Sequence, residues 1–470
     1  MESVARNRAE SSDAESARGQ GSPMTADADK AESSTAMSMP SNATKAGLGE
    51  AKSDLAHVVV FDPSLLENSK PGIGARLLEY LSAYPQRLLG LLRWFTPALN
   101  LPFSGWSWVL RYDEVREVLS HDAEFPVPWH DKMKELTLQR NFVLGMPRDQ
   151  TYRDTYEQLA KAFPRDDVPT YVTPQARKET EQLLADKYDE RPFDAIQEVI
   201  AAVPTRMCES YYGIPIRQQE TSLFAKANLA ISRYLFVPDT NDADKDLALS
   251  AVALVSGKIR AAIALQRQAS KPTAESPLTR LAHMERDDER IHAQLLGMTL
   301  GFIPTNVLAG GNILQTLLLE PSFLRACVRA ARADNDDLLW RCLREALRFR
   351  HINLGPWRLC PHGYTLGAGG SRPIKIPAGN KVLAIVQTAM FDTKRIDRPH
   401  SFDPDRPDEH YMVFGVGQHW CLGAYIAAAQ LTQTFKVLLR KGRLETACKA
   451  ERMKRFSVYP LHLNVRIRQA

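Results

Sequence analysis

A cysteine at the start of a predicted helix is the residue best placed to do chemistry in this sequence. Cys421 lies in the segment FGVGQHWCLG, and a stretch with apolar residues at helical spacing follows it as far as Arg440. The positive end of a helix dipole and the unpaired N–H groups of the first turn stabilise a thiolate. Gly415 and Gly417 permit a tight turn that a β-carbon would prevent. The pattern predicts a thiolate that can act as a ligand, with Gly423 adding no side chain beside it.

A charged pair upstream has the spacing of one helix face. Glu345 and Arg348 lie three residues apart in LWRCLREALRFR, where apolar residues occupy both sides. A partly buried pair needs further hydrogen-bond partners to be tolerated. Arg406, in the segment FDPDRP, can supply one. We assign these three residues to structure rather than to catalysis.

The cysteine segment resembles the signature of the cytochrome P-450 family, Phe-x-x-Gly-x-(His/Arg)-x-Cys-x-Gly. The matching residues are Phe414, Gly417, His419, Cys421 and Gly423. The Glu-x-x-Arg pair and the FDPDRP segment are similar to the family's Glu–Arg–Arg lock and occur in the family's order. The resemblance covers roughly residues 75 to 468.

The resemblance implies a cofactor and its contacts. The cofactor is haem b (iron protoporphyrin IX), with Cys421 as the proximal ligand of the iron, because a thiolate donates electron density that favours O–O cleavage. In the family, the residues corresponding to His419 and Arg358 contact haem propionates, and the Phe at the position of Phe414 packs near the sulfur.

The oxygen-activating helix departs from the family pattern (Ala/Gly)-Gly-x-(Asp/Glu)-Thr. Two registers are possible in GMTLGFIPTNVLAGGNIL, with either Thr305 or Ile313 at the threonine position. Pro321 resembles the proline that ends this helix in the family, and its distance of 16 residues from Thr305 fits. We therefore choose Thr305 and Asn306 as the catalytic candidates. Pro304 then replaces the acid and is expected to kink the helix.

Three hypotheses for proton delivery follow, because proline cannot relay a proton. Delivery uses Thr305 and ordered water, or a carboxylate on the substrate, or oxygen activation is skipped and a substrate hydroperoxide is rearranged. An Asn in this helix occurs in hydroperoxide-rearranging relatives, which keeps the third hypothesis open. No Arg occurs between His292 and Gln315, and this argues against a fatty-acid peroxygenase.

The resemblance implies a monooxygenase that oxidises an apolar organic substrate with O2. No reductase domain fits in 470 residues, so electrons are expected from a separate ferredoxin or flavin reductase partner. The alternatives are a hydroperoxide isomerase or dehydratase, and a haem protein that binds a ligand without turnover. By resemblance, an aromatic-lined pocket draws on Phe142, Tyr234, Phe236, Phe302, Leu354, Trp357 and Val458.

The elements that must position these residues are mostly helices. We predict a mainly α fold with a small β portion, the cytochrome P-450 fold, in which a long central helix crosses the haem and the Cys loop precedes the last long helix. Helical patterns occur at 149–163, 174–188, 194–212, 219–232, 244–270, 288–319, 336–350 and 423–440. Strands are predicted in WSWVLRY, WRLC, GYTLG, KVLAIV, SVYP and LHLNVRI.

Composition sets the remaining expectations. Residues 1–56 have no aromatic residue and are expected to form a disordered tail before the domain at 57–470. The net charge of +5 is small for this length and does not demand nucleic acid. We expect no transmembrane segment, no signal peptide, and a cytoplasmic monomer. The stretch from Gly74 to Leu101 is apolar, and core packing is favoured over a membrane-surface role.

Overall fold

The structure, a computed structural model, describes residues 60–68, 88–187, 191–238, 240–269, 275–370 and 372–469. Contacts divide the chain into Met1–Val58 and Val59–Ala470, and all described residues belong to the second unit. The predicted tail and most of the apolar stretch that begins at Gly74 lie outside the described residues.

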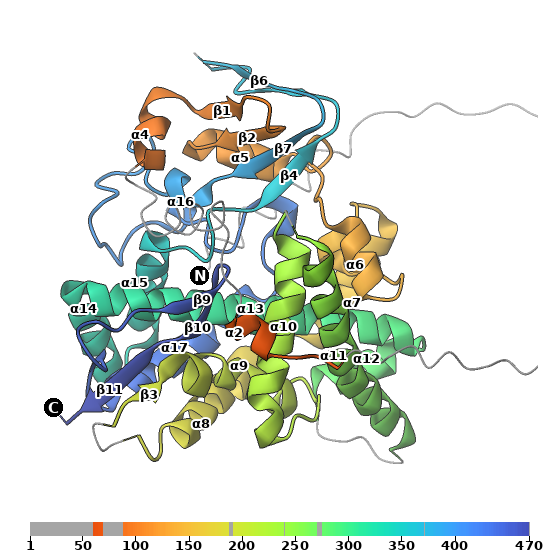
Figure 1. Ribbon diagram of the computed structural model, residues 1–470, viewed down its shortest axis with the longest axis vertical. Helices are drawn as coiled ribbons and strands as arrows, with labels where there is room; N and C mark the ends of the chain where they lie inside the picture. Colours follow the sequence, from red (N-terminus) through yellow and green to blue (C-terminus); the bar gives the residue numbers. More distant parts are fainter. Residues whose placement is uncertain are drawn as a thin grey trace, which may run out of the picture. The chain divides into compact units, whose positions relative to one another are not determined.

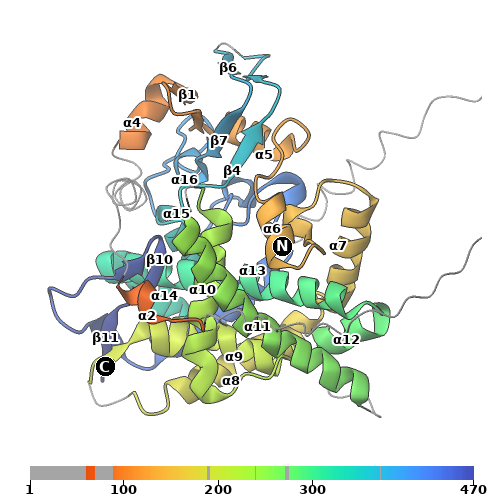
Figure 2. The ribbon, with the colours of Figure 1, turned by 45° about the vertical axis from the view of Figure 1, so that its right-hand side comes forward.

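The predicted central helix is confirmed as α13 (Asp288–Leu319), whose first N–H groups are capped by the Asp287 carboxylate. It is apolar on all sides and is therefore buried along most of its length. It packs against α10 (Thr221–Phe236), α11 (Asp242–Gln268) and α17 (Ala424–Arg440), and both views show it crossing the unit beside α10 (Figures 1 and 2).

Two prolines that the sequence singled out lie in α13 and just after its end. Pro304 lies inside a helix that continues on both sides, and Pro321 begins a new helix, α14 (Pro321–Arg332), as well as following the end of α13. Proline is tolerated at a first helical position because the missing N–H has no partner there in any case. By length and composition, α11 and α13 could each cross a membrane, but the most apolar window of α13 is 78% buried in the protein.

Shorter helices surround this centre, and several were not predicted. The α6 and α12 helices are short and their apolar residues are only weakly periodic, so the sequence did not predict them. The remaining helices are α2 (Ser64–Glu67), α4 (Leu88–Phe95), α5 (Tyr112–Ser120), α6 (His130–Leu136), α7 (Gln150–Ala162), α8 (Thr173–Leu183), α9 (Ala202–Ser210), α12 (Pro277–Met284), α15 (Asp336–Phe349) and α16 (Val386–Ala389), with single turns or π-helical stretches at 143–145, 168–172, 196–200, 218–220, 408–410 and 417–419.

The β portion is small, as predicted. The largest sheet has the order β1-β2-β7-β4, in which β2 and β7 pair in parallel and the outer pairs are antiparallel. Its strands are β1 (Ala98–Leu101), β2 (Trp106–Val109), β7 (Asn380–Ala384) and β4 (Trp357–Cys360). The other strands are β3 (Phe193–Asp194), β5 (Tyr364–Leu366), β6 (Ile374–Ile376), β8 (Arg443–Thr446), β9 (Lys454–Phe456), β10 (Tyr459–His462) and β11 (Asn464–Arg468).

Candidate functional site

The Cys421 loop has the predicted tight geometry. Gly415 and Gly417 adopt φ values of +78° and +72°, which favour glycine. A β-carbon on Gly417 would also lie 2.7 Å from the Leu119 carbonyl oxygen at the end of α5. The Cys421 N–H donates to the Phe414 carbonyl at 3.0 Å and closes the loop just before α17. Cys421 therefore occupies a fixed position two residues before the N-cap of this helix.

Burial and the start of α17 act on the Cys421 thiol in opposite directions. The Cys421 side chain is half-buried, and desolvation raises the pKa of its thiol to about 11, against the lowering effect of the Gly423 backbone N–H. Burial therefore opposes the thiolate, whereas the helix terminus and a bound cation favour it.

Gly423 and Phe414 are the other two residues of the cysteine segment for which the sequence predicts a role. Gly423 is the N-cap of α17 with an ordinary φ of −85°, so its backbone conformation does not itself require glycine. A β-carbon there would lie 4.0 Å from the Cys421 sulfur. Phe414 is half-buried and stacks on Trp340 with ring centroids 6.0 Å apart.

Arg358 and His419 are brought together from distant parts of the sequence. Arg358, on β4, is 3% exposed, and its Nε has no hydrogen-bond partner among the described residues. Burial lowers the pKa of Arg358 to about 10, and Asp122 opposes this effect. Burial, with the nearby Arg358 charge, lowers the pKa of His419 to about 4, so its imidazole is neutral at pH 7.

Asp122 is the charged residue of this group that the sequence did not reveal. Its Oδ1 lies 3.7 Å from His419 Nε2 and has no hydrogen-bond partner among the described residues. Desolvation raises the pKa of Asp122, although Arg358 and Arg148 lower it. The segment SHDAEF around it carries no motif, so only the fold could have identified it.

Two aromatic residues complete the surroundings of the loop. The Tyr152 hydroxyl donates to the Gln418 carbonyl at 3.3 Å, and its ring meets that of His419 edge-on. Trp129 lies under the Arg358 guanidinium, 5.6 Å from its ring centroid, and donates its indole N–H to the Leu144 carbonyl. Tyr152 occupies a position where the family resemblance would place a histidine.

One face of α13 opens onto unfilled space. Between Ile291 and Leu314, only Gly301 and Thr305 are not buried, and they lie one turn apart on the same face. A β-carbon built on Gly301 would meet no atom within 4 Å among the described residues. The Thr305 hydroxyl donates to the Gly301 carbonyl of its own helix.

Asn306 lies on a different face from Thr305. It is 1% exposed and donates to the Phe302 carbonyl at 2.8 Å, while its Oδ1 has no partner among the described residues. Phe302 stacks on Tyr212, which is itself buried. Of the two catalytic candidates, only Thr305 therefore borders the open space.

The Glu345 lock has the geometry that the sequence suggested. Glu345 accepts two hydrogen bonds from Arg348, at 2.7 and 2.8 Å, and forms an ion pair with Arg406 at 3.5 Å. The Asp403 N–H and the Tyr411 hydroxyl also donate to it. All three charged side chains are at most 5% exposed, and the two arginines donate to backbone carbonyls.

The aromatic residues expected around a substrate separate into two groups. Trp357 donates its indole N–H to the Phe236 carbonyl, and its ring lies near those of Trp106 and Trp129. Tyr234 instead donates to Glu135. Trp357 and Phe236 therefore belong to an aromatic cluster beside Arg358, whereas the Tyr234 hydroxyl is bound to a carboxylate, and their contact with a substrate stays a prediction.

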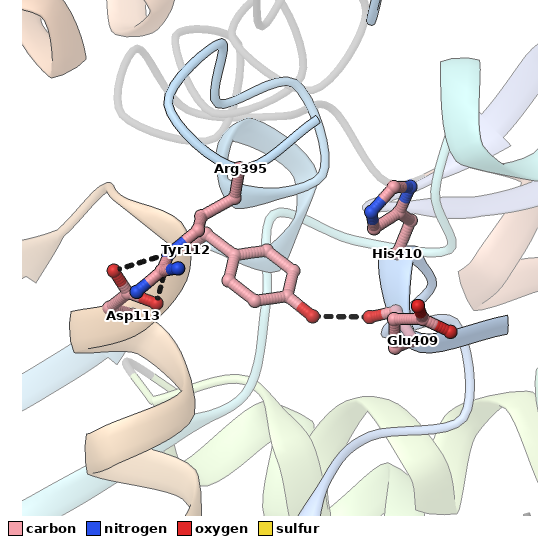
Figure 3. A pocket seen from close by; sticks show the side chains of 5 residues that line it. All are labelled: Tyr112, Asp113, Arg395, Glu409 and His410. Atoms are coloured by element: carbon pink, nitrogen blue, oxygen red, sulfur yellow. Dashed lines mark hydrogen bonds and ion pairs between the residues drawn. The ribbon is translucent and has the colours of Figure 1, made fainter. Parts of the chain in front are cut away.

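A surface pocket lies apart from these residues. It has a volume of about 310 Å³ and is lined by Tyr112, Asp113, Arg395, Glu409 and His410 (Figure 3). Arg395 and Asp113 neutralise each other, with Arg395 Nε 2.9 Å from both carboxylate oxygens. None of the predicted haem-contacting residues lines this pocket.

The arrangement around Cys421 fits an iron porphyrin. The Cys421 loop is half-buried, and Gly301 and Thr305 offer an accessible helix face. The unsatisfied Arg358 Nε and the neutral His419 can donate to carboxylates, and haem propionates supply that chemistry. The roles of the individual residues toward haem stay predictions.

Comparison with known proteins agrees with this geometry. The family model "Cytochrome P450" matches residues 330–458. The chain is 32% identical over 146 residues to "Cytochrome P-450 monooxygenase DoxA" of Streptomyces peucetius subsp. caesius, a match that covers 31% of this chain and 33% of that protein. The matches to the first curated relatives thus span about a third of their length.

Two longer matches carry the comparison across most of the chain. A "Bifunctional dioxygenase (DOX)-epoxy alcohol synthase (EAS)" of Fusarium oxysporum (strain Fo5176) is 21% identical over 71% of this chain and 29% of that protein. The solved structure of P450BioI in complex with a hexadec-9Z-enoic acid ligated acyl carrier protein has a TM-score of 0.69 at 17% identity, covering 83% of this chain and all of that one. The chain therefore has the cytochrome P450 fold, and the region around Cys421 matches the model of the cytochrome P450 family, whose members are haem-thiolate enzymes.

Proposed function

We propose that the protein is a haem-thiolate monooxygenase that inserts one oxygen atom into an apolar organic substrate. The observation that carries this proposal is the tight Cys421 loop before α17, with the buried Arg358 close to His419. Bound haem supplies the iron at which oxygen chemistry takes place. The name of DoxA as a monooxygenase supports the same reaction class.

The protein's own residues would have three tasks. Cys421 holds the iron from one side, and Arg358 and His419 orient the porphyrin by donating hydrogen bonds to its carboxylates. Thr305, on the open face of α13, orients water beside the reacting oxygen. The cluster of Trp106, Trp129 and Trp357 favours an apolar substrate.

The proposal includes a cytoplasmic location and a separate electron donor. The ferredoxin or flavin partner is inferred from the family, whose members typically use separate redox proteins. Its surface on this chain is not assigned.

A second candidate function is rearrangement of a substrate hydroperoxide, without O2 or electrons. Two observations favour it. Pro304 stands where a proton-relaying acid is expected, and the Thr305 hydroxyl already donates to Gly301. The Fusarium relative is named an epoxy alcohol synthase as well as a dioxygenase.

Two experiments test these proposals. Cys421→Ser should abolish the red-shifted Soret band that thiolate ligation gives the reduced carbon monoxide complex. Survival of that band would refute the ligand assignment. Purified wild-type protein is then supplied with a panel of apolar substrates and fatty-acid hydroperoxides, with and without a reductase. Reductant-dependent turnover supports the monooxygenase, and turnover of hydroperoxide alone supports the rearrangement.

A further inference from the structure

The outer face of α4 is apolar although the helix lies at the surface. Leu88, Leu91, Trp94 and Phe95 recur at helical spacing and are all exposed, with Trp94 73% and Phe95 61% exposed. Together with Phe103, at the tip of the β1–β2 turn, we call these five residues the α4 face. Phe103 has a φ of +58° and a fully exposed ring. Apolar side chains gathered in this way mark an interaction surface.

The orientation of α4 is fixed by its polar contacts. Arg93, the cation of this helix, is buried and donates to the Thr388 carbonyl at 2.5 Å. Arg111 donates to the Arg93 and Trp94 carbonyls, and Arg372 donates to the Phe95 carbonyl. Three carbonyls of the last turn are therefore satisfied by arginines. The helix presents its apolar side chains outward while its own charge points inward.

A cationic hairpin lies beside this face. Arg372 joins the β5–β6 hairpin to the end of α4, and the Asn100 side chain of β1 donates to the Lys375 carbonyl of β6. Both views place α4, β1 and β6 at the same end of the unit (Figures 1 and 2). Arg372 and Lys375 are both exposed.

The two chain segments of this region contain arginine and lysine but no carboxylate of their own. The sequence contains no Asp or Glu from Leu88 to Arg111, and none from Pro361 to Lys381. The nearest carboxylates that contact the hairpin come from α5, where Glu117 accepts hydrogen bonds from the Tyr364 hydroxyl and the Gly367 N–H. Exposed apolar and aromatic side chains bordered by cations match the composition of helices that lie in a membrane interface.

We propose that the α4 face docks this protein reversibly on a lipid surface that contains anionic phospholipid. Leu91, Trp94, Phe95 and Phe103 enter the interface, and Arg372 and Lys375 meet the headgroups. This proposal does not depend on which reaction the haem site performs. It would bring apolar substrates dissolved in the lipid close to the protein.

The test is co-sedimentation of the haem-loaded full chain with vesicles of phosphatidylcholine alone or with phosphatidylglycerol added. Binding is expected to be stronger to the anionic vesicles. Leu91→Ser/Trp94→Ser/Phe103→Ser should weaken binding to both by about tenfold or more. Arg372→Glu/Lys375→Glu should weaken binding to anionic vesicles by about tenfold. Its binding to vesicles of phosphatidylcholine alone should equal that of the wild type.

The matched control is Leu65→Ser/Leu265→Ser/Leu319→Ser, which removes exposed leucines from α2, α11 and α13. It should bind like the wild type, and the reduced carbon monoxide spectrum verifies that each variant is folded. The proposal is overturned if the wild type does not bind vesicles, or if both triple variants behave alike. A dimer in light scattering that only the α4-face variant dissociates, without vesicle binding, would assign the face to a second copy of this chain instead.

Discussion

At the residue scale, Asp122 places a carboxylate beside the donors that are proposed to hold the haem carboxylates. Its carboxylate lies 3.7 Å from His419 and is the opposite charge that acts on Arg358. A haem carboxylate held by the same donors would be repelled by it. We predict that Asp122→Asn slows haem loss about fivefold, equivalent to about 1 kcal/mol. Transfer of haem to a scavenging acceptor protein measures this rate.

The pH dependence of that difference has a defined sign. Desolvation raises the pKa of Asp122, and the charges that act on it come from Arg358, Arg148, His121 and Glu124. Above this pKa the carboxylate is charged and repels haem, and below it the carboxyl group is neutral. The advantage of Asp122→Asn should therefore be full near neutral pH and disappear as the pH falls through the pKa of Asp122. A constant advantage at all pH values would contradict the repulsion.

The sequence could predict the Cys421 loop but not its electrostatics. Five residues at fixed spacing identified the loop, because its tight turn depends on local sequence. Asp122, Arg358 and His419 lie far apart in the chain, so their proximity depends on tertiary structure. The raised pKa of Cys421 has the same origin, since desolvation comes from residues that the local motif does not contain.

At the scale of elements, the Glu345 lock connects α15 to the segment before the Cys421 loop. Glu345→Gln would leave Arg348 and Arg406 without their buried counter-charge. We predict a loss of about 3 to 5 kcal/mol in the free energy of unfolding, measured by denaturant titration. Arg341→Ala, which breaks exposed ion pairs of the same helix, should cost about 1 kcal/mol or less. Equal losses in both variants would argue against a buried lock.

The helix α13 shows what periodicity can and cannot establish. Its bounds were predicted from the sequence, because a long apolar pattern is the strongest local signal. The helix continues through Pro304, where the sequence predicts a kink, because packing on all sides holds it together despite the missing donor. The short β1 strand and α6 were missed because their few residues pair or pack only in the finished fold.

Pro304 is expected to lower the stability of α13. The residue is buried within a helix that continues on both sides, and its ring removes one backbone N–H donor. We predict that Pro304→Ala raises the free energy of unfolding by about 1 to 3 kcal/mol. Thermal and denaturant unfolding of the apoprotein measure this gain. Unchanged or lower stability would mean that packing of the proline ring offsets the lost hydrogen bond.

At the scale of the whole molecule, haem and the fold are expected to stabilise each other. Arg358 is buried with an unpartnered Nε among the described residues, and Gly301 borders unfilled space, so these groups gain most when haem binds. A ligand at a thousandfold excess over its Kd stabilises the folded state by about 4 kcal/mol.

Removal of haem should therefore lower the Tm of the protein. It should also increase backbone hydrogen exchange, mainly in the segments that line the site. We expect faster exchange in the Cys421 loop, in β4 and around Gly301 and Thr305, because these segments line the site. The α8 and α9 helices, which contain none of these residues, should change little. Exchange spectra of apoprotein and holoprotein at equal concentration make the comparison. Faster exchange throughout α8 and α9 would show instead that haem organises the entire unit rather than its site.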